Sequence, residues 1–220
     1  MVDFHYKKVP LEDDLIGEVF RLRYKVYCLE CGFEDPADYA SGIETDEFDE
    51  FSTHFCAYEE ISKSLVGTAR IILPSHRSFP ILKHFQINEN PYTDIAENKY
   101  GEISRLAISK DYRRRMIDRA IYSNNVIDFQ DEKEKRDRRK HYETQLVTGL
   151  YHCIYRESLA LDLTHLYAVM SKGLHYLLTS WGLVWHPIGP EKYYHGLRTP
   201  YVASVAENMA WFDANLSATM

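Results

Sequence analysis

The chain has 220 residues, of which 45% are hydrophobic and 27% charged, and its formal net charge is −7 at pH 7. This composition is typical of a globular protein, and we expect one domain spanning residues 1–220. No apolar run approaches the roughly 18 residues that a membrane-spanning helix needs, and the N-terminus lacks the apolar core of a secretory signal. These absences predict a cytoplasmic protein without stable membrane insertion.

The N-terminal part of the chain predicts one helix, a long loop and two strands. In residues 11–33 apolar residues recur at helical spacing, and Gly32 is suited to cap the C-terminal end of this helix. Residues 34–52 are rich in acids and turn formers, which predicts a loop whose length points to a functional role. Residues 53–60 and 64–74 read as two strands joined by a short turn.

The C-terminal part continues as strand, helix, strand, helix and two further strands. The segments are 102–109, about Tyr142 to Leu161, 165–170, 171–182, 183–189 and 200–206. This order predicts an α/β fold in which helices flank one mixed β-sheet, an α-β-α sandwich.

Cysteines give little support for a metal site. Cys28 and Cys31 form a single CxxC, whereas a structural zinc site needs about four ligands with local pairing. We therefore expect no bound metal and cysteines that pack against a helix.

Charge is unevenly distributed along the chain. Residues 28–62 contain eleven acidic residues and no Lys or Arg, whereas residues 110–140 contain eleven basic and seven acidic residues. The mixed run within the basic segment is typical of a solvated helix face. Arg113, Arg114 and Arg115 directly follow a predicted strand, which favours docking of an anionic partner for these three residues.

Charged residues embedded in apolar segments are the candidate site. The sequence contains no phosphate-binding loop, dinucleotide fingerprint or serine-hydrolase elbow. The embedded charges are Arg23, Asp49, Arg70, Glu102 and Arg105. Because a buried charge is costly unless it is paired, we expect these residues to meet one another or a polar ligand. Alternation along the strand places Glu102 and Ser104 on one face, toward a cleft, and directs Arg105 from the other face to the acidic loop.

The order of these residues resembles that of the acyl-homoserine-lactone autoinducer synthases. The shared pattern is Arg23 with Tyr27, then Phe33, the EFD run ending at Asp49, the G-x-x-R ending at Arg70, and E-x-S-R from Glu102 to Arg105. The blocks FRLRYKVYCLECGFEDP, EISRLAISKDYRRR and YAVM are also similar to acyltransferases that accompany PEP-CTERM/exosortase systems, which resemble N-acyl amino acid synthases. The resemblance implies a GNAT-like fold and acyl transfer to an amine. Ser52 and Phe33 depart from the autoinducer-synthase pattern, which argues against the homoserine-lactone pathway.

On this interpretation the residues have specific roles. Glu102 is the candidate general base for the acceptor amine, and a backbone N–H near Ala107 or Ile108 is the candidate oxyanion donor. Arg23, Asp49, Arg70 and Arg105 would shape the acceptor site. The remaining candidates for substrate binding are Tyr27, Phe33, Ser104 and Met170.

The donor is expected to be an acyl carrier protein. Ordinary GNAT enzymes bind the coenzyme A diphosphate with a glycine-rich loop, and Arg114, Met116 and Asp118 stand at those glycine positions here. An acyl-phosphopantetheine carrier needs only a slot and basic contacts, which Arg113, Arg114 and Arg115 would supply. We expect no permanently bound cofactor, an amino acid or similar small amine as acceptor, and no nucleic acid. The alternatives are a CoA-dependent N-acetyltransferase and a non-catalytic module that binds acyl groups or nucleic acid.

Overall fold

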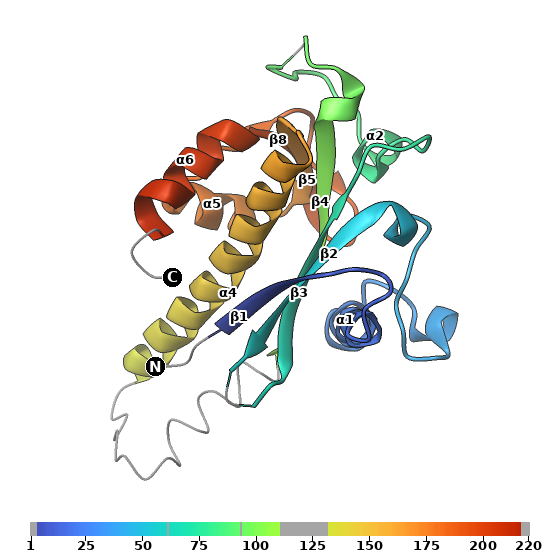
Figure 1. Cartoon of the computed structure of the whole chain (residues 1–220), viewed down its shortest axis with the longest axis vertical. Helices are drawn as coiled ribbons and strands as arrows, with labels where there is room; N and C mark the ends of the chain where they lie inside the picture. Colours follow the sequence, from blue (N-terminus) through green and yellow to red (C-terminus); the bar gives the residue numbers. More distant parts are fainter. Residues whose placement is uncertain (1–3, 61, 93, 111–131, 217–220) are drawn as a thin grey trace. The chain divides into compact units, whose positions relative to one another are not determined.

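An eight-stranded mixed sheet organises the chain in the computed structural model, which describes residues 4–60, 62–92, 94–110 and 132–216 (Figure 1). Its strands are β1 (Phe4–Val9), β2 (Ser52–Glu59), β3 (Leu65–Ile72), β4 (Tyr100–Ile108), β5 (His165–Met170), β6 (His186–Pro187), β7 (Lys192–Tyr193) and β8 (Leu197–Ser204). They lie in the order β1-β2-β3-β4-β5-β8-β6, with β7 paired to β8. Strands β4 and β5 are parallel, whereas β1–β2 and β5–β8 are antiparallel. The predicted α/β fold with a mixed sheet is confirmed.

Five α-helices and several short helical segments accompany the sheet within the described residues. The α-helices are α1 (Ile16–Tyr24), α2 (Pro80–His84), α4 (Glu132–Ala160), α5 (Lys172–Ser180) and α6 (Val205–Leu216). A π-helical segment, η1 (Lys25–Glu30), continues directly from α1. None of the helices in the described part of the chain is long and apolar enough to cross a membrane.

The chain divides into two compact units, each built from three separate segments. Unit 1 comprises Met1–Thr45, His54–Ala69 and Arg105–Tyr151, and unit 2 comprises Asp46–Thr53, Arg70–Ser104 and His152–Met220. Strands β2, β3 and β4 each contribute residues to both units. The expectation of one domain over residues 1–220 stays a prediction.

Unit 1 places α1 and α4 on opposite faces of its strands (Figure 1). On β1, Val9 packs with Val19 of α1 and Cys56 of β2. Tyr6 points to the opposite face of β1 from Val9, and its hydroxyl donates to the carbonyl oxygen of Gln145 in α4 at 2.9 Å. Gly149 lies against the Tyr6 ring, where an added Cβ would come within 2.5 Å of three ring and hydroxyl atoms. A glycine is therefore required where α4 crosses β1.

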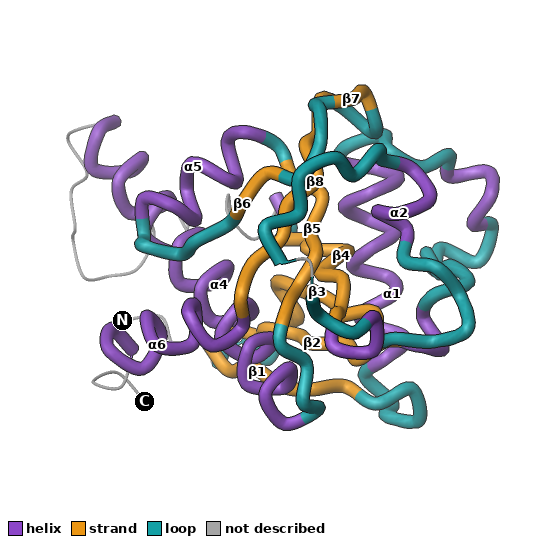
Figure 2. Tube along the Cα trace, turned by 90° about the horizontal axis from the view of Figure 1, so that it is seen from above, coloured by secondary structure: helices purple, strands orange, loops and turns teal. Residues whose placement is uncertain are grey.

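Unit 2 places α2 and α5 on opposite faces of β5 and β8 (Figure 2). Ile81 of α2 belongs to the same buried apolar cluster as Tyr167 of β5 and Val202 of β8. On the other face, Tyr201 stacks on His175 of α5 with ring centroids 4.4 Å apart. The described sheet of unit 2 is thus covered on both faces, as expected for strands that read as nearly continuous apolar runs.

Several element boundaries differ from the sequence-based expectations. The first helix was predicted over residues 11–33, but its α-helical part ends at Tyr24 and η1 completes it. Gly32 has φ +61°, the left-handed conformation expected just beyond a helix end. Strand β1 and helices α2 and α6 were not predicted. Helix α4 begins at Glu132, ten residues before the predicted start, and the predicted strand 183–189 contributes only the two residues of β6.

Candidate active site

Three polar or aromatic side chains follow one another on a single face of β4. These side chains belong to Tyr100, Glu102 and Ser104, and Gly101 and Ile103 between them face the other side of the strand. Within unit 2, the shared face packs against groups of α2 and β3. The predicted common face of Glu102 and Ser104 is confirmed.

Glu102 is a buried carboxylate held by a helix amide. Its exposed fraction is 3%, and its Oε2 accepts a hydrogen bond from the backbone N–H of Ile81 in α2 at 2.9 Å. In the sheet register Glu102 lies opposite Tyr167 of β5. The amide fixes the orientation of the carboxylate, which is what a proton acceptor in a catalytic site needs.

Arg70 of β3 contacts Ser104 on this face of β4 and uses most of its guanidinium donors. Its Nη1 and Nη2 donate to the two carboxylate oxygens of Asp46 at 2.6 and 2.7 Å, and Nη1 also donates to Asp49 at 2.5 Å. Its Nε donates to the hydroxyl of Ser104 at 2.9 Å. Arg70 has an exposed fraction of 1%, so this bidentate arrangement satisfies a buried charge.

A second arginine cluster lies in unit 1. Glu44, with an exposed fraction of 0%, accepts from Arg23 Nε on one carboxylate oxygen at 2.5 Å and from Arg105 Nε on the other at 3.0 Å. Arg105 Nη2 lies 2.9 Å from the same oxygen of Glu44 and 3.8 Å from Glu34. The prediction that Arg105 ties its strand to the acidic loop is confirmed.

Tyr27 and Phe33 lie beside Arg105 in unit 1. The Arg105 guanidinium lies 5.3 Å above the centre of the Tyr27 ring, and the Phe33 ring is 6.0 Å from that of Tyr27. The Tyr27 hydroxyl donates to the carbonyl oxygen of Leu106 at 3.2 Å. The Tyr27 ring therefore lies against this part of β4, and Phe33 packs beside Tyr27.

The other predicted site residues are placed as follows. Ala107 is buried against Leu22 and Val26 of the first helical segment, and Ile108 is the last residue of β4. Met170 ends β5 with an exposed fraction of 2%. Arg113, Arg114 and Arg115 lie outside the described residues.

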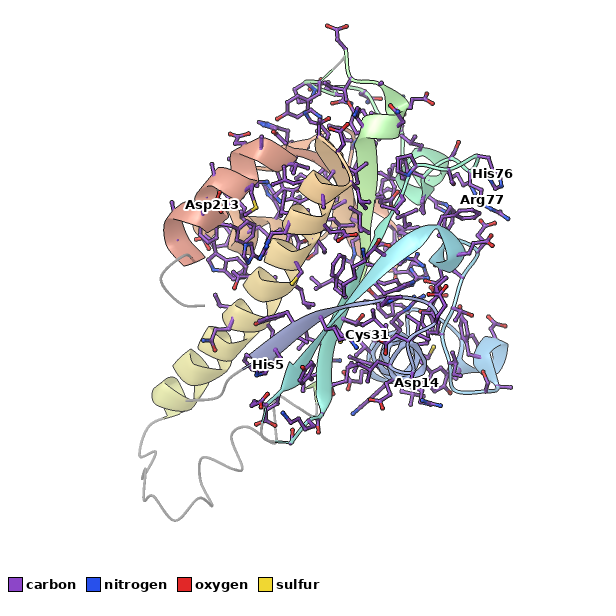
Figure 3. All side chains as sticks on the ribbon, viewed as in Figure 1. His5, Asp14, Cys31, His76, Arg77 and Asp213 are labelled. Atoms are coloured by element: carbon purple, nitrogen blue, oxygen red, sulfur yellow. The ribbon has the colours of Figure 1, made fainter. Side chains whose placement is uncertain are left out.

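A surface cleft of about 750 Å³ opens in unit 2 beside Tyr100 of β4, and Glu102 is not among the residues that line it. Its aromatic wall includes Tyr100 and Tyr167, whose rings stack with centroids 4.7 Å apart. Burial, and to a lesser extent Tyr100, raises the pKa of Tyr167, so its phenol stays protonated. The polar rim includes His76 and Arg77, which Figure 3 labels on the loop after β3. A cleft with an aromatic wall and a few polar groups is typical of a small-molecule site.

Sequence reasoning missed the two carboxylates that hold the arginines. Glu44 and Asp46 both lie in the acidic loop, only a few residues before the predicted Asp49. The available signal was the count of charges, because several buried arginines require more than one buried carboxylate. The expectation that the two arginine clusters form one network stays a prediction.

Metal and thiol chemistry find no support in the described residues. No group of three or more His, Cys, Asp or Glu side chains gathers there as metal ligands would. None of the four cysteines forms a disulfide, and burial followed by the Glu44 carboxylate raises the pKa of the Cys28 thiol. A raised pKa makes a thiol less reactive.

Comparisons with known proteins agree on the fold. Residues 22–123 match the family described as acetyltransferase (GNAT) domain. The structure of TofI in a ternary complex with an inhibitor and MTA has TM-score 0.66 and 15% identity, covering 96% of each chain. BjaI, a CoA-dependent acyl-homoserine lactone synthase solved with MTA, has TM-score 0.59 and 18% identity, covering 97% of this chain and 89% of its own. FeeM, an N-acyl amino acid synthase from uncultured soil microbes, has TM-score 0.55 and 13% identity, covering 100% of this chain and 99% of its own.

A search of curated proteins finds no significant sequence match. These three structural likenesses fall below 25% identity and extend over nearly the whole chain. The chain therefore has the fold of the GNAT-type acyltransferases, in the form found in acyl-homoserine lactone and N-acyl amino acid synthases. The predicted fold resemblance is confirmed, and the PEP-CTERM/exosortase association stays a prediction.

Proposed function

We propose that the protein is an N-acyltransferase that moves a fatty acyl group from an acyl carrier protein thioester to the amine of an amino acid or similar small acceptor. One observation carries this proposal. In an acyltransferase fold, the buried Glu102 carboxylate is oriented by a helix amide on the strand face that also meets Arg70. This arrangement provides a fixed proton acceptor beside an organised set of polar groups.

The reaction assigned to this site begins with proton removal. Amines are mostly protonated near neutral pH, so Glu102, directly or through a water molecule, takes a proton from the acceptor ammonium group. The free amine attacks the thioester carbonyl and forms a tetrahedral oxyanion, for which a backbone N–H near Ala107 or Ile108 is the candidate donor. Collapse breaks the carbon–sulfur bond, and the phosphopantetheine thiolate takes up the proton that the nitrogen loses as the amide forms.

The cleft in unit 2 is our candidate for the acceptor. Its volume of about 750 Å³ suits a small molecule, and its wall residue Tyr167 lies opposite Glu102 in the sheet register. Arg77 on the rim would bind an acceptor carboxylate while the aromatic wall contacts the apolar part. Arg77→Ala should therefore raise the acceptor KM several-fold while the donor KM stays unchanged, and Lys172→Ala on the exposed start of α5 is the matched control.

The sequence after Ile108 favours the carrier protein as donor. Arg114, Met116 and Asp118 replace the glycines that a diphosphate-binding loop needs, and Asp118 would repel a diphosphate. With acyl chains of equal length, we expect kcat/KM to be at least about tenfold higher for the carrier thioester than for the CoA thioester. Substituting Arg113, Arg114 and Arg115 by Ser, or adding salt, should raise the carrier KM several-fold and change kcat less.

Acyl-CoA is the second candidate donor. Two structures with the same fold, BjaI and MesI, are described as CoA-dependent acyl-homoserine lactone synthases. Equal kcat/KM for both thioesters, together with a carrier KM that ignores salt and the triple substitution, would favour acyl-CoA over our proposal.

The catalytic assignment is tested with Glu102→Gln. Glutamine keeps the shape and a carbonyl oxygen for the Ile81 amide, but it cannot take a proton, so kcat should fall roughly 10²-fold or more. Glu207→Gln, at an exposed position in α6, is the matched control and should retain full kcat. A fully active Glu102→Gln enzyme would remove Glu102 from the chemistry. Thermal melts of both variants show whether the fold is intact.

A further inference from the structure

We propose that the hydroxyl of Tyr27 is a positioning group that holds the bent C-terminal part of β4, Arg105–Ile108, in the conformation that acyl transfer requires. The inference rests on the proposed function, because it concerns the part of β4 that carries the candidate oxyanion donors. It assigns a role to one atom, the phenol oxygen, and not to the aromatic ring as a whole.

Two backbone irregularities meet at this point in unit 1. The first helix changes from α to π geometry over Lys25–Glu30, and Tyr27 lies within the π segment. Arg105 in β4 has φ +53°, a left-handed conformation that non-glycine residues rarely adopt. Both kinds of distortion cost energy and are common at functional sites, where surrounding contacts must hold them in place.

Tyr27 and Glu44 supply contacts of that kind. The Tyr27 ring lies under the Arg105 guanidinium at 5.3 Å, and Glu44 accepts from Arg105 Nε. The Tyr27 hydroxyl then donates to the carbonyl oxygen of Leu106, the residue after the left-handed one. Tyr27 thus holds two successive β4 residues: its ring contacts the side chain of Arg105, and its hydroxyl binds the backbone of Leu106.

The hydroxyl has a function that the ring cannot supply. A phenylalanine ring would stack under Arg105 equally well, whereas only tyrosine brings a donor to the Leu106 carbonyl. Losing this bond removes one restraint on the peptide that joins Leu106 to Ala107. That peptide contains the N–H of Ala107, one of the two candidate oxyanion donors.

The expected consequence is a change in turnover more than in binding. Catalytic groups must hold their geometry closely, and a misplacement of about 1 Å can cost roughly 10²-fold in rate. We therefore expect Tyr27→Phe to lower kcat at least about tenfold, with both substrate KM values changed less than about threefold.

Tyr6→Phe is the matched control. It removes the same atom from the same unit, and the lost bond is again from a phenol hydroxyl to a backbone carbonyl, that of Gln145. Because this bond joins β1 to α4, it should leave kcat within about twofold of the wild type. Both variants should show similar decreases in melting temperature, so a general loss of stability cannot explain a difference in kcat.

The experiment measures kcat and KM for wild type, Tyr27→Phe and Tyr6→Phe, with long-chain acyl carrier protein and acyl-CoA as donors and a mixture of amino acids as acceptors. It also measures amide hydrogen exchange at Ala107 and Ile108. A selective fall in kcat with faster exchange in Tyr27→Phe alone supports the inference. Equal kcat in the two variants overturns it while the proposed function stands. Absence of acyl transfer by the wild type overturns the proposed function, and the inference with it.

Discussion

The two arginine clusters of this protein differ in the group that is shared. Within the described residues of unit 1, two guanidinium groups, Arg23 and Arg105, bind the single carboxylate of Glu44. In unit 2, one guanidinium, Arg70, binds the two carboxylates of Asp46 and Asp49. The shared group is therefore an anion, Glu44, in unit 1 and a cation, Arg70, in unit 2. Removing the shared group takes a partner from two charges at once. The most damaging substitution should therefore be at Glu44 in unit 1 and at Arg70 in unit 2.

The largest effect is expected from Glu44→Gln. Both carboxylate oxygens of Glu44 bind arginines, and its exposed fraction is 0%, so the change leaves two guanidinium groups without their shared anion. The free energy of unfolding should fall by roughly 3–5 kcal/mol. Urea denaturation measures this loss.

Glu34→Gln is the matched control for that change. Glu34 lies 3.8 Å from Arg105, and a quarter of its side chain is exposed, so it should cost less than about 1 kcal/mol. Similar losses for Glu34→Gln and Glu44→Gln would contradict the central role of Glu44.

In unit 2 the arginine should matter more than either acid. Arg70→Met leaves two carboxylates without their shared cation and should cost roughly 3 kcal/mol. Asp46→Asn removes the negative charge of the Arg70–Asp46 pair, in which the Asp46 side chain is partly exposed. The free energy of unfolding should fall by about 1–2 kcal/mol. A double-mutant cycle on the two positions should give a coupling energy of about 1–3 kcal/mol. If Asp46→Asn were the more damaging change, the comparison between the clusters would fail.

The smallest effect concerns pH and three histidines of unit 2. Burial lowers the pKa of His165 from its ordinary value of 6.5, and burial is also the main cause of the lowered pKa values of His84 and His152. A lowered pKa in the folded state means that the unfolded chain binds protons first as the pH falls. Stability should be full above pH 6.5 and decrease as the pH falls from there through the folded-state pKa values.

His165→Gln should reduce this pH dependence. His165 packs against Tyr92 at 4.1 Å between ring centroids, so the substitution also lowers stability at all pH values. The informative quantity is the slope of unfolding free energy against pH between 7 and 5, which is compared with that of His5→Gln at an exposed position. An unchanged slope in His165→Gln would mean that other groups cause the acid sensitivity.

Strand prediction succeeded where burial produces a simple pattern. Four predicted strands begin and end within two residues of an observed strand: 53–60, 64–74, 102–109 and 165–170. They were predicted well because their apolar residues are nearly continuous. Strand β1 escaped prediction because its sequence FHYKKV places two lysines in succession, and these are exposed at the sheet edge. Helix α6 was missed because an apolar run continues from β8 across its start at Val205, with no glycine or proline to mark the change.

Local patterns in the sequence were enough to identify the α/β fold class, the common face of Glu102 and Ser104, and the attachment of Arg105 to the acidic loop. Period-two alternation fixes a side-chain face within one strand, and the cost of burying charge requires partners of opposite sign. The choice of partners was decided only by the tertiary structure. Glu44 and Asp46 are separated by a single residue, yet they belong to different units and bind different arginines. Partner choice depends on distances of a few ångströms between segments far apart in the chain, and no local pattern encodes those distances.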